Sequence, residues 1–342
     1  SQAQLPSWMT GLTAFYDDAH QPFAPQSLEF KSRAKLPVYH RQLVGYDFPA
    51  GKQSDRKTLF ENSDIQLWAI DDEIAIASFK SKANTIGQAV LDGLEQALDI
   101  AKQHCQGLII YQHDAHNFSS GADLRNVLEL MQAQKWSSLE TMLQQFQNLA
   151  LKLRYSAIPT VAALRGRALG GGCELLMHCG AVIAAFESYP GLVEAGVGLI
   201  PAGGGTKEMA YRAAQQAKGT DLFLSMKPFF EQIATAQVAG SAPDARQKGY
   251  LRVSDGWVMH HNEVLLAATS RIKNMQAENY LPPVSPTIKV AGREGHARLK
   301  AGLVNWLEGQ FISEHDYLLA DKLAFVLCGG DVNEGTMVDE SW

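Results

Sequence analysis

The spacing of apolar residues changes several times along the chain, and each change predicts a new element. Residues 65–70 and 74–79 are rich in β-branched and aromatic residues and flank the acidic Asp71-Asp72-Glu73, which predicts a hairpin. Later segments alternate between helical spacing and short apolar runs. The further elements predicted here are a helix over residues 87–103, a strand over 108–111, a helix over 137–155, and strands over 160–164 and 181–185.

The clearest helical pattern lies in residues 137–155, where the apolar residues form one stripe and Ser137 with Glu140 fits a capping box. Strands alternate with helices through about residue 210, which predicts an α/β fold with a largely parallel sheet. From residue 212 onward the pattern is mostly helical. The helices expected there cover residues 219–238, 242–249, 260–277, 293–308 and 314–327.

Composition narrows the class of protein. A chain of 342 residues is long enough for about two domains, or for one large domain with an appendage. The formal net charge of −6 and the absence of a basic stripe do not favour nucleic-acid binding. The 4 cysteines have no paired spacing, which fits a reducing cytoplasm, and no apolar run is long enough to span a membrane. The first residues lack both a signal peptide and an initiator Met, so we expect a processed chain or a fragment.

Two glycine-containing segments follow predicted strands. Residues 168–174 contain the triplet Gly170-Gly171-Gly172, and residues 117–123 contain Gly121. Glycine lets a backbone approach a ligand closely, and unpaired N–H groups from two loops could converge on one developing oxyanion. The structural alternatives are tight packing of helix on strand for the triplet, and a strand-to-helix turn capped by Asp123 for the other segment.

Two carboxylates stand near these glycines in the sequence. Glu174 follows the triplet, and Glu194 lies 20 residues later in an apolar, glycine-rich stretch. If folding brings both into one cavity, burial and mutual repulsion would keep one protonated and one ionised, which provides a general acid and a general base. The alternative is a pair of unrelated surface glutamates.

Other chemistries receive less support. His113 and His116 have no third ligand at a useful spacing, so we expect no metal site, and His260-His261 fits a solvated loop. Ser119 and Ser120 lie outside any G-x-S-x-G elbow. No dinucleotide fingerprint follows a strand and no P-loop motif occurs, so we expect no nicotinamide site in this chain.

Taken together, these segments resemble the crotonase (enoyl-CoA hydratase/isomerase) family over residues 62–270. The resemblance implies a spiral of βαβ turns with a helical C-terminal region, and a trimer or a dimer of trimers. The chain departs from the family pattern at Tyr250-Leu251 and at Pro201-Ala202-Gly203, which puts the shape of the acyl pocket in question. The matching segments are residues 82–84, 118–123, 159–163, 168–174, 191–201, 203–206 and 242–251.

The resemblance also implies roles for individual residues. Glu174 and Glu194 fall on the two catalytic glutamates of the hydratases, with Glu174 activating water and Glu194 delivering a proton. The backbone N–H groups of Ala122 and Gly171 fall on the oxyanion hole. Lys82, Ala83 and Ser120 fall near the CoA-binding loops.

The implied activity is reversible hydration of a trans-2-enoyl-CoA, with the acyl-CoA as substrate and no metal or cofactor in this chain. A Δ3-Δ2-enoyl-CoA isomerase and a non-catalytic assembly domain remain the alternatives.

The flanks resemble bacterial β-oxidation proteins in which a NAD-dependent 3-hydroxyacyl-CoA dehydrogenase precedes the crotonase domain, and a thiolase is a possible partner. We therefore expect an arm or the tail of a preceding dehydrogenase domain over residues 1–60, a crotonase core over 61–258 and a helical region over 259–342.

Overall fold

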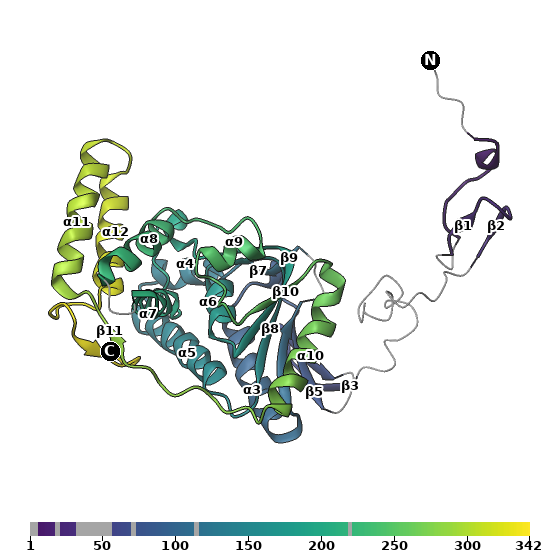
Figure 1. Ribbon diagram of the computed structural model, residues 1–342, viewed down its shortest axis with the longest axis horizontal. Helices are drawn as coiled ribbons and strands as arrows, with labels where there is room; N and C mark the ends of the chain where they lie inside the picture. Colours follow the sequence, from purple (N-terminus) through teal and green to yellow (C-terminus); the bar gives the residue numbers. More distant parts are fainter. Residues whose placement is uncertain (1–5, 18–20, 32–56, 70–72, 113–115, 218–220) are drawn as a thin grey trace, which may run out of the picture.

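The computed structural model describes residues 6–17, 21–31, 57–69, 73–112, 116–217 and 221–342. Its centre is a sheet in the order β10-β9-β8-β6-β5-β4-β3, with β7 paired to β8 beside this path (Figure 1). The strands from β5 through β6, β8 and β9 to β10 are parallel, while β3, β4 and β5 are antiparallel neighbours. The strands are β3 Lys57–Glu61, β4 Ile65–Ala69, β5 Ile74–Phe79, β6 Gly107–Tyr111, β7 Asn117–Ser119, β8 Thr160–Leu169, β9 Ala181–Gly191 and β10 Gly256–Val258.

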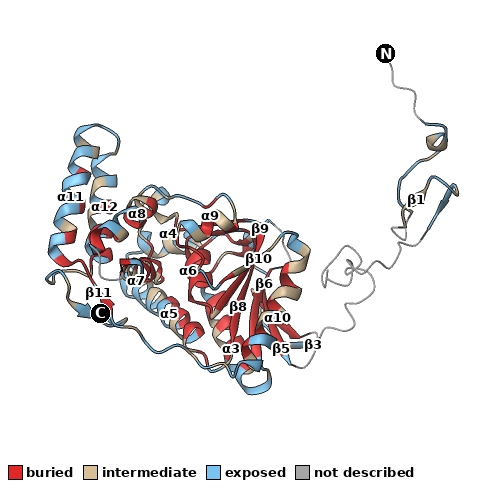
Figure 2. Cartoon of the chain, viewed as in Figure 1, coloured by how far each residue is buried: buried red, intermediate tan, exposed pale blue. Residues whose placement is uncertain are grey.

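Helices cover both faces of this sheet, and period-two alternation in the strands explains why. In β6, Leu108 and Ile110 belong to one buried cluster while Ile109 and Tyr111 belong to another. The first cluster packs against α3, α5 and α6, and the second packs against α10 (Figures 1 and 2). The helices are α3 Gln88–His104, α4 Leu124–Gln132, α5 Trp136–Arg154, α6 Gly171–His178, α7 Gly205–Ala217, α8 Leu222–Ala234, α9 Ala242–Gln247, α10 Val264–Ala277, α11 Gly292–Glu308 and α12 Glu314–Leu327.

The predicted alternation of strands and helices is confirmed, including the antiparallel pairing of β4 with β5, although Asp71 and Asp72 lie outside the described residues. Regular structure begins before Ile65, because β3 already pairs with β4 from residue 57. The five helices predicted for the C-terminal part are all present, and a 3-10 turn, His261–Glu263, stands at the start of the third, over residues 260–277.

The predicted capping box of Ser137 with Glu140 is wrong. Helix α5 begins at Trp136 after Lys135, and no side chain caps it. The preceding connection sets this start, because Gln134 adopts a positive φ of 53° and the N–H of Lys135 donates to the carbonyl of Leu130 in α4. Ser137 therefore lies inside the first turn rather than before it.

Helix α7 was not predicted as a separate helix, and it matters for the site because it follows Gly203-Gly204-Gly205 directly. Its buried residues recur at helical spacing through Met209 and Ala213. Two small ribbons complete the structure: β1 Phe23–Ala24 with β2 Glu29–Phe30, and β11 Ile288–Lys289 with β12 Met337–Val338. Among the described residues, no helix combines the length and apolar character needed to cross a membrane.

Candidate active site

Glu174 lies in the first turn of a helix that is buried along its whole length. Strand β8 ends at Leu169, Gly170 turns the chain with a positive φ of 51°, and α6 begins at Gly171. Glu174 is only 3% exposed. Its Oε1 accepts a hydrogen bond of 2.8 Å from the N–H of Gly205, so the carboxyl group is held from the α7 side.

Glu194 reaches the same place from the next strand. The parallel register of β8 with β9 aligns Leu169 with Gly191, and the N–H of Gly170 donates to the carbonyl of Gly191 over 2.9 Å. The chain then enters the short 3-10 helix Glu194–Val197. A methyl group placed on Gly170 would lie 3.1 Å from Glu194 Oε1, and one placed on Gly171 would lie 3.9 Å from Glu174 Oε2. The two carboxyl groups therefore meet beside the glycine triplet.

The two carboxyl groups have different surroundings. Burial raises the pKa of Glu174 to about 7, while hydrogen bonds from the N–H groups of Gly205 and Gly203 act in the opposite direction. Burial raises the pKa of Glu194 well above its usual range, and the charge of Glu174 raises it further. Both carboxyl oxygens of Glu194 are buried without a hydrogen bond of normal geometry from any described residue, and only the nearby backbone N–H groups of Glu194 and Val193 act to lower its pKa. Glu174 therefore ionises first, and Glu194 keeps its proton.

The backbone N–H groups of Ala122 and Gly171 lie close to these carboxyl groups. A methyl group on Gly171 would lie 3.5 Å from the N atom of Ala122, so the two loops approach each other closely. The bridge between Ile86 and Ala122 uses the carbonyl of Gly121 and the N–H of Asp123, and leaves the N–H of Ala122 without an acceptor in the described structure. The N–H of Gly171 also has no acceptor there, because the helix bonds of α6 start at Glu174. Such a pair can stabilise a negative oxygen.

The turn that carries Lys82 and Ala83 lies against the loop that carries Ser120. The N–H and Oγ of Ser120 both donate to the carbonyl of Ala83, over 3.2 and 2.9 Å. Ser119 Oγ donates to the carbonyl of Asn84 over 2.7 Å. Lys82, Ala83 and Ser120 are exposed, so this pair of loops forms a surface beside Ala122. Asp123 caps α4 at the same point, so the strand-to-helix turn predicted as the structural alternative is present as well.

Sequence reasoning missed the residues that surround Glu174. A methyl group on Gly203 would lie 1.9 Å from Phe146 Cε1 and 2.6 Å from Glu174 Oε2, so the Phe146 ring from α5 lies against the carboxyl group. The stripe in residues 137–155 identified Phe146 only as a core residue. The glycines at 203 and 205 were visible in the sequence, but nothing local indicated that they contact Glu174.

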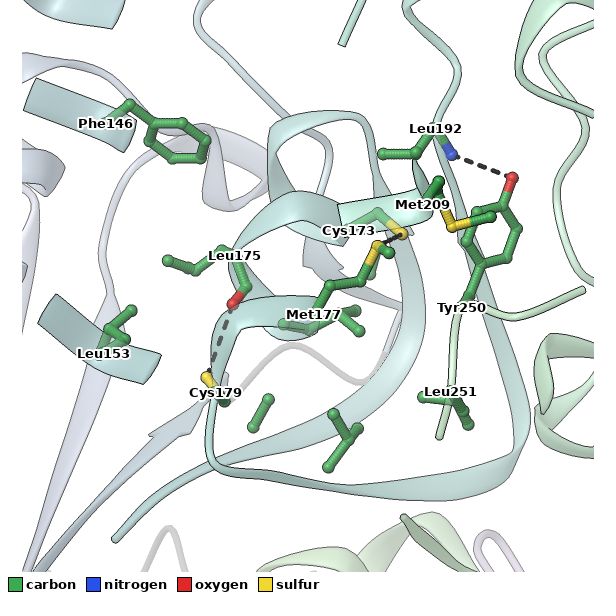
Figure 3. Close-up of a cluster of buried hydrophobic side chains, with 14 of the residues drawn as sticks. Phe146, Leu153, Cys173, Leu175, Met177, Cys179, Leu192, Met209, Tyr250 and Leu251 are labelled. Carbon is green, nitrogen blue, oxygen red and sulfur yellow. Dashed lines mark hydrogen bonds between the residues drawn. The ribbon is translucent and has the colours of Figure 1, made fainter. Parts of the chain in front are cut away.

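Tyr250, where the chain departs from the family pattern, supports the Glu194 segment. It is completely buried, its hydroxyl donates to the carbonyl of Gln237 over 2.9 Å, and it accepts from the N–H of Leu192 over 3.4 Å. Figure 3 shows this contact between Leu192 and Tyr250 above the cluster that contains Cys173 and Met209. The tyrosine hydroxyl thus fixes the backbone two residues before Glu194.

Of the histidines considered in the sequence, His260 and His261 lie outside this site. His113 is outside the described residues, and His260 and His261 are exposed with stacked rings 4.7 Å apart. Within the described parts of the chain, no cluster of three or more His, Cys, Asp or Glu side chains could hold a metal ion.

Comparisons with known proteins agree with this architecture. The sequence model of the family described as "Enoyl-CoA hydratase/isomerase" matches residues 70–233. A Bacillus subtilis (strain 168) protein named "Probable 3-hydroxyacyl-CoA dehydrogenase" is 36% identical over 282 residues, which are 82% of this chain and 35% of that protein. The chain thus spans about a third of the length of that relative.

Solved structures show the same fold. The enoyl-CoA hydratase from Bacillus anthracis superimposes with a TM-score of 0.51 at 22% identity, covering 77% of this chain and 90% of that chain. A Thermobifida fusca YX protein solved in complex with acetoacetyl-CoA gives a TM-score of 0.50 at 19% identity, covering 77% of this chain and 93% of that chain. The predicted crotonase-like α/β fold is therefore confirmed, and residues 70–233 match the sequence model of the enoyl-CoA hydratase/isomerase family.

Proposed function

We propose that this chain adds water reversibly to a trans-2-enoyl-CoA to give a 3-hydroxyacyl-CoA. The observation that carries the proposal is that the carboxyl groups of Glu174 and Glu194 meet in one buried site. Glu174 accepts a hydrogen bond from Gly205, whereas Glu194 accepts none of normal geometry from a described residue. Hydration needs one ionised carboxylate to accept a proton from water and one carboxylic acid to donate a proton. The raised pKa values of both carboxyl groups and the hydrogen bond from Gly205 to Glu174 support this division.

The proposed reaction proceeds from the water molecule to the thioester. Glu174 takes a proton from water as the water oxygen bonds to C3, and the π electrons of the double bond move through C2 to the thioester oxygen. The N–H groups of Ala122 and Gly171 stabilise that enolate, and losing one such donor costs about 3 kcal/mol. Glu194 then gives its proton to C2, and the electrons return to re-form the carbonyl. A proton passes from Glu174 to Glu194 to restore the starting state.

We propose that the CoA part of the substrate lies on the exposed surface formed by Lys82, Ala83 and Ser120. This surface adjoins Ala122, so a thioester bound there would present its carbonyl oxygen to the two N–H groups. Lys82 offers a positive charge to CoA phosphates. The Thermobifida fusca relative solved with acetoacetyl-CoA supports the same class of ligand.

The direct test measures hydration of crotonyl-CoA by the wild-type chain and by Glu174→Gln and Glu194→Gln. We expect each substitution to lower kcat by about 10²- to 10⁴-fold, because each removes a proton acceptor or donor while keeping the shape of the side chain. Calorimetric titration should show that both variants still bind a CoA thioester. Glu308→Gln, an exposed glutamate on α11, is the matched control and should hydrate at the wild-type rate. Wild-type rates in both active-site variants would refute the site assignment.

The same assays separate the alternatives. An isomerase acting on 3-enoyl-CoA needs only one of the carboxyl groups, so conversion of a 3-enoyl thioester without hydration of a 2-enoyl thioester would favour isomerisation. A non-catalytic assembly domain would bind no CoA thioester and would not need two buried carboxyl groups.

We further propose that hydration here uses no metal or other cofactor, because N–H groups can supply the stabilisation of the enolate. Added chelator should leave the rate of hydration unchanged.

The long relative named as a dehydrogenase supports a role beside a NAD-dependent 3-hydroxyacyl-CoA dehydrogenase in a longer protein. The remaining proposals follow from the family resemblance: a trimeric homo-oligomer in the cytoplasm, with a thiolase as partner. Light scattering and a pull-down with thiolase would test them.

A further inference from the structure

The C-terminal segment after β12 sends one acidic side chain into the protein. Glu340 has a side chain only 5% exposed and forms ion pairs with Arg154, at 3.2 Å, and with Lys207. It also accepts a hydrogen bond from the hydroxyl of Tyr155. Pairing of β12 with β11 delivers Glu340 to this position, 186 residues along the chain from Arg154. Arg154 is the last residue of α5, Tyr155 follows directly after it, and Lys207 lies in the first turn of α7.

Lys207 connects Glu340 to the backbone of Glu174. The Lys207 ammonium donates to Nε2 of His178 over 3.2 Å, and Nδ1 of His178 donates to the carbonyl of Glu174 over 2.7 Å. One tautomer satisfies both contacts, because a carbonyl can only accept and an ammonium can only donate. Burial lowers the pKa of His178 to about 3, so the ring stays neutral and keeps this arrangement.

The first turn of α7 holds Glu174 in two ways. Gly205 donates to the Glu174 carboxyl group, and Lys207, two residues later, connects through His178 to the Glu174 carbonyl. We propose that Glu340 is a positioning residue for Glu174, which it orients by holding Lys207 and therefore the first turn of α7. The inference rests on the proposed hydration, since it assigns Glu174 a catalytic task, and it involves a part of the chain beyond residues 70–233.

The charges around Glu340 explain why a carboxylate is needed there. Arg154, Lys207 and Arg212 bring three positive charges close to one buried carboxylate, Glu208, which pairs with both arginines. Glu340 is the second carboxylate of this described cluster, and it is the acidic partner of Lys207. Without it, Lys207 and Arg154 would repel each other in a poorly solvated region, so Lys207 would turn toward solvent and release His178.

The test compares Glu340→Gln, Lys207→Met and the double variant with the wild-type chain on crotonyl-CoA. We expect each single variant to lower kcat by about tenfold while changing KM by less than about twofold, because a misplaced carboxylate slows the reaction more than binding. The kcat of the double variant should lie within about twofold of that of the slower single variant, since both substitutions act on one contact.

The variants should also change the pH–rate profile. When the first turn of α7 loosens, the hydrogen bond from Gly205 to Glu174 is lost, and the acid limb should move to higher pH because that bond favours ionised Glu174 beside protonated Glu194.

Asp339→Asn is the matched control, because Asp339 is adjacent to Glu340, exposed, and hydrogen-bonded within the segment to Ser341 and Trp342. It should keep the wild-type kcat and the wild-type acid limb. Hydrogen exchange measured by mass spectrometry on peptides covering residues 203–210 provides a readout that needs no activity. Exchange should be faster in Glu340→Gln than in the wild type, and unchanged in Asp339→Asn. Unchanged exchange and unchanged kcat in Glu340→Gln, or multiplicative losses in the double variant, would overturn the inference. A wild-type chain that fails to hydrate would instead refute the proposed function, and the exchange result would still decide the role of Glu340.

Discussion

The N–H of Gly205 donates a 2.8 Å hydrogen bond to Glu174 Oε1, and no described donor of normal geometry reaches the carboxyl group of Glu194. Both carboxyl groups are buried, and burial raises the pKa of Glu194 further above its usual range than that of Glu174. The negative charge of ionised Glu174 raises the pKa of Glu194 further, because a second negative charge close by would be repelled. These different surroundings are what the proposed division into a base, Glu174, and an acid, Glu194, requires.

The rate of hydration should follow a bell-shaped dependence on pH. Because the pKa of Glu174 lies near 7, kcat/KM should rise through that region as Glu174 becomes able to accept a proton from water. It should fall at higher pH as Glu194 loses the proton that C2 needs. Steady-state kinetics with crotonyl-CoA from about pH 5 to pH 10 give both limbs, which belong to the pair rather than to single residues. An acid limb near 4.5, the ordinary value for Glu, would contradict the assignment.

Glu194→Gln should gain thermal stability relative to the wild type as the pH rises. The folded protein holds the Glu194 proton above pH 4.5, where the unfolded chain has released it, so wild-type stability falls as pH rises from 4.5 toward the raised pKa. Glutamine cannot ionise and escapes this loss. The difference in Tm, variant minus wild type, should increase by at least about 3 °C between about pH 5 and pH 8. Glu308→Gln should show no such trend, and a constant difference for Glu194→Gln would indicate an ordinary pKa.

Local patterns in the sequence were enough to predict most strands and helices, because burial on the two faces of the sheet imposes period two on β6 and period three to four on α3. They failed where two local signals compete. Ser137 and Glu140 fit a helix start, but the turn that ends α4 already fixes the chain direction and starts α5 one residue earlier.

Contacts between distant segments could not be predicted from spacing. Glu174 and Glu194 meet because the register of β8 with β9 places Gly191 beside Leu169, and no local pattern encodes that register. Local reasoning raised the pair only as a hypothesis, and the family resemblance favoured it over two unrelated surface glutamates. The contact between Lys207 and Glu340 spans 133 residues, and a glutamate near the end of the sequence looks like any exposed charge until the fold buries it.

Gly203→Ala should impair both folding and hydration. The new methyl group would lie 1.9 Å from Phe146 Cε1 and 2.6 Å from Glu174 Oε2, so the ring or the carboxyl group must move. We expect the free energy of unfolding to fall by about 1–3 kcal/mol and kcat to fall by about tenfold or more. Urea unfolding and steady-state kinetics measure the two effects. Gly302→Ala in α11, where a methyl group meets nothing within 4 Å, should instead gain about 0.5–1 kcal/mol and keep full activity. Equal behaviour of the two variants would show that the close approach at Gly203 is unimportant.

Tyr250→Phe should show how far the Glu194 segment depends on one hydroxyl group. The substitution keeps the buried ring but leaves the N–H of Leu192 and the carbonyl of Gln237 without their shared partner. An unsatisfied buried polar group costs about 1–3 kcal/mol, so urea unfolding should report a loss of that size. Because Leu192 lies two residues before Glu194, kcat should also fall, while KM stays close to the wild-type value. Tyr317→Phe in α12 removes a hydroxyl that bonds to no described residue and should change neither quantity. If Tyr250→Phe lowers stability but leaves kcat untouched, the hydroxyl supports the core and the position of Glu194 is set by the backbone pairing of β8 with β9 alone.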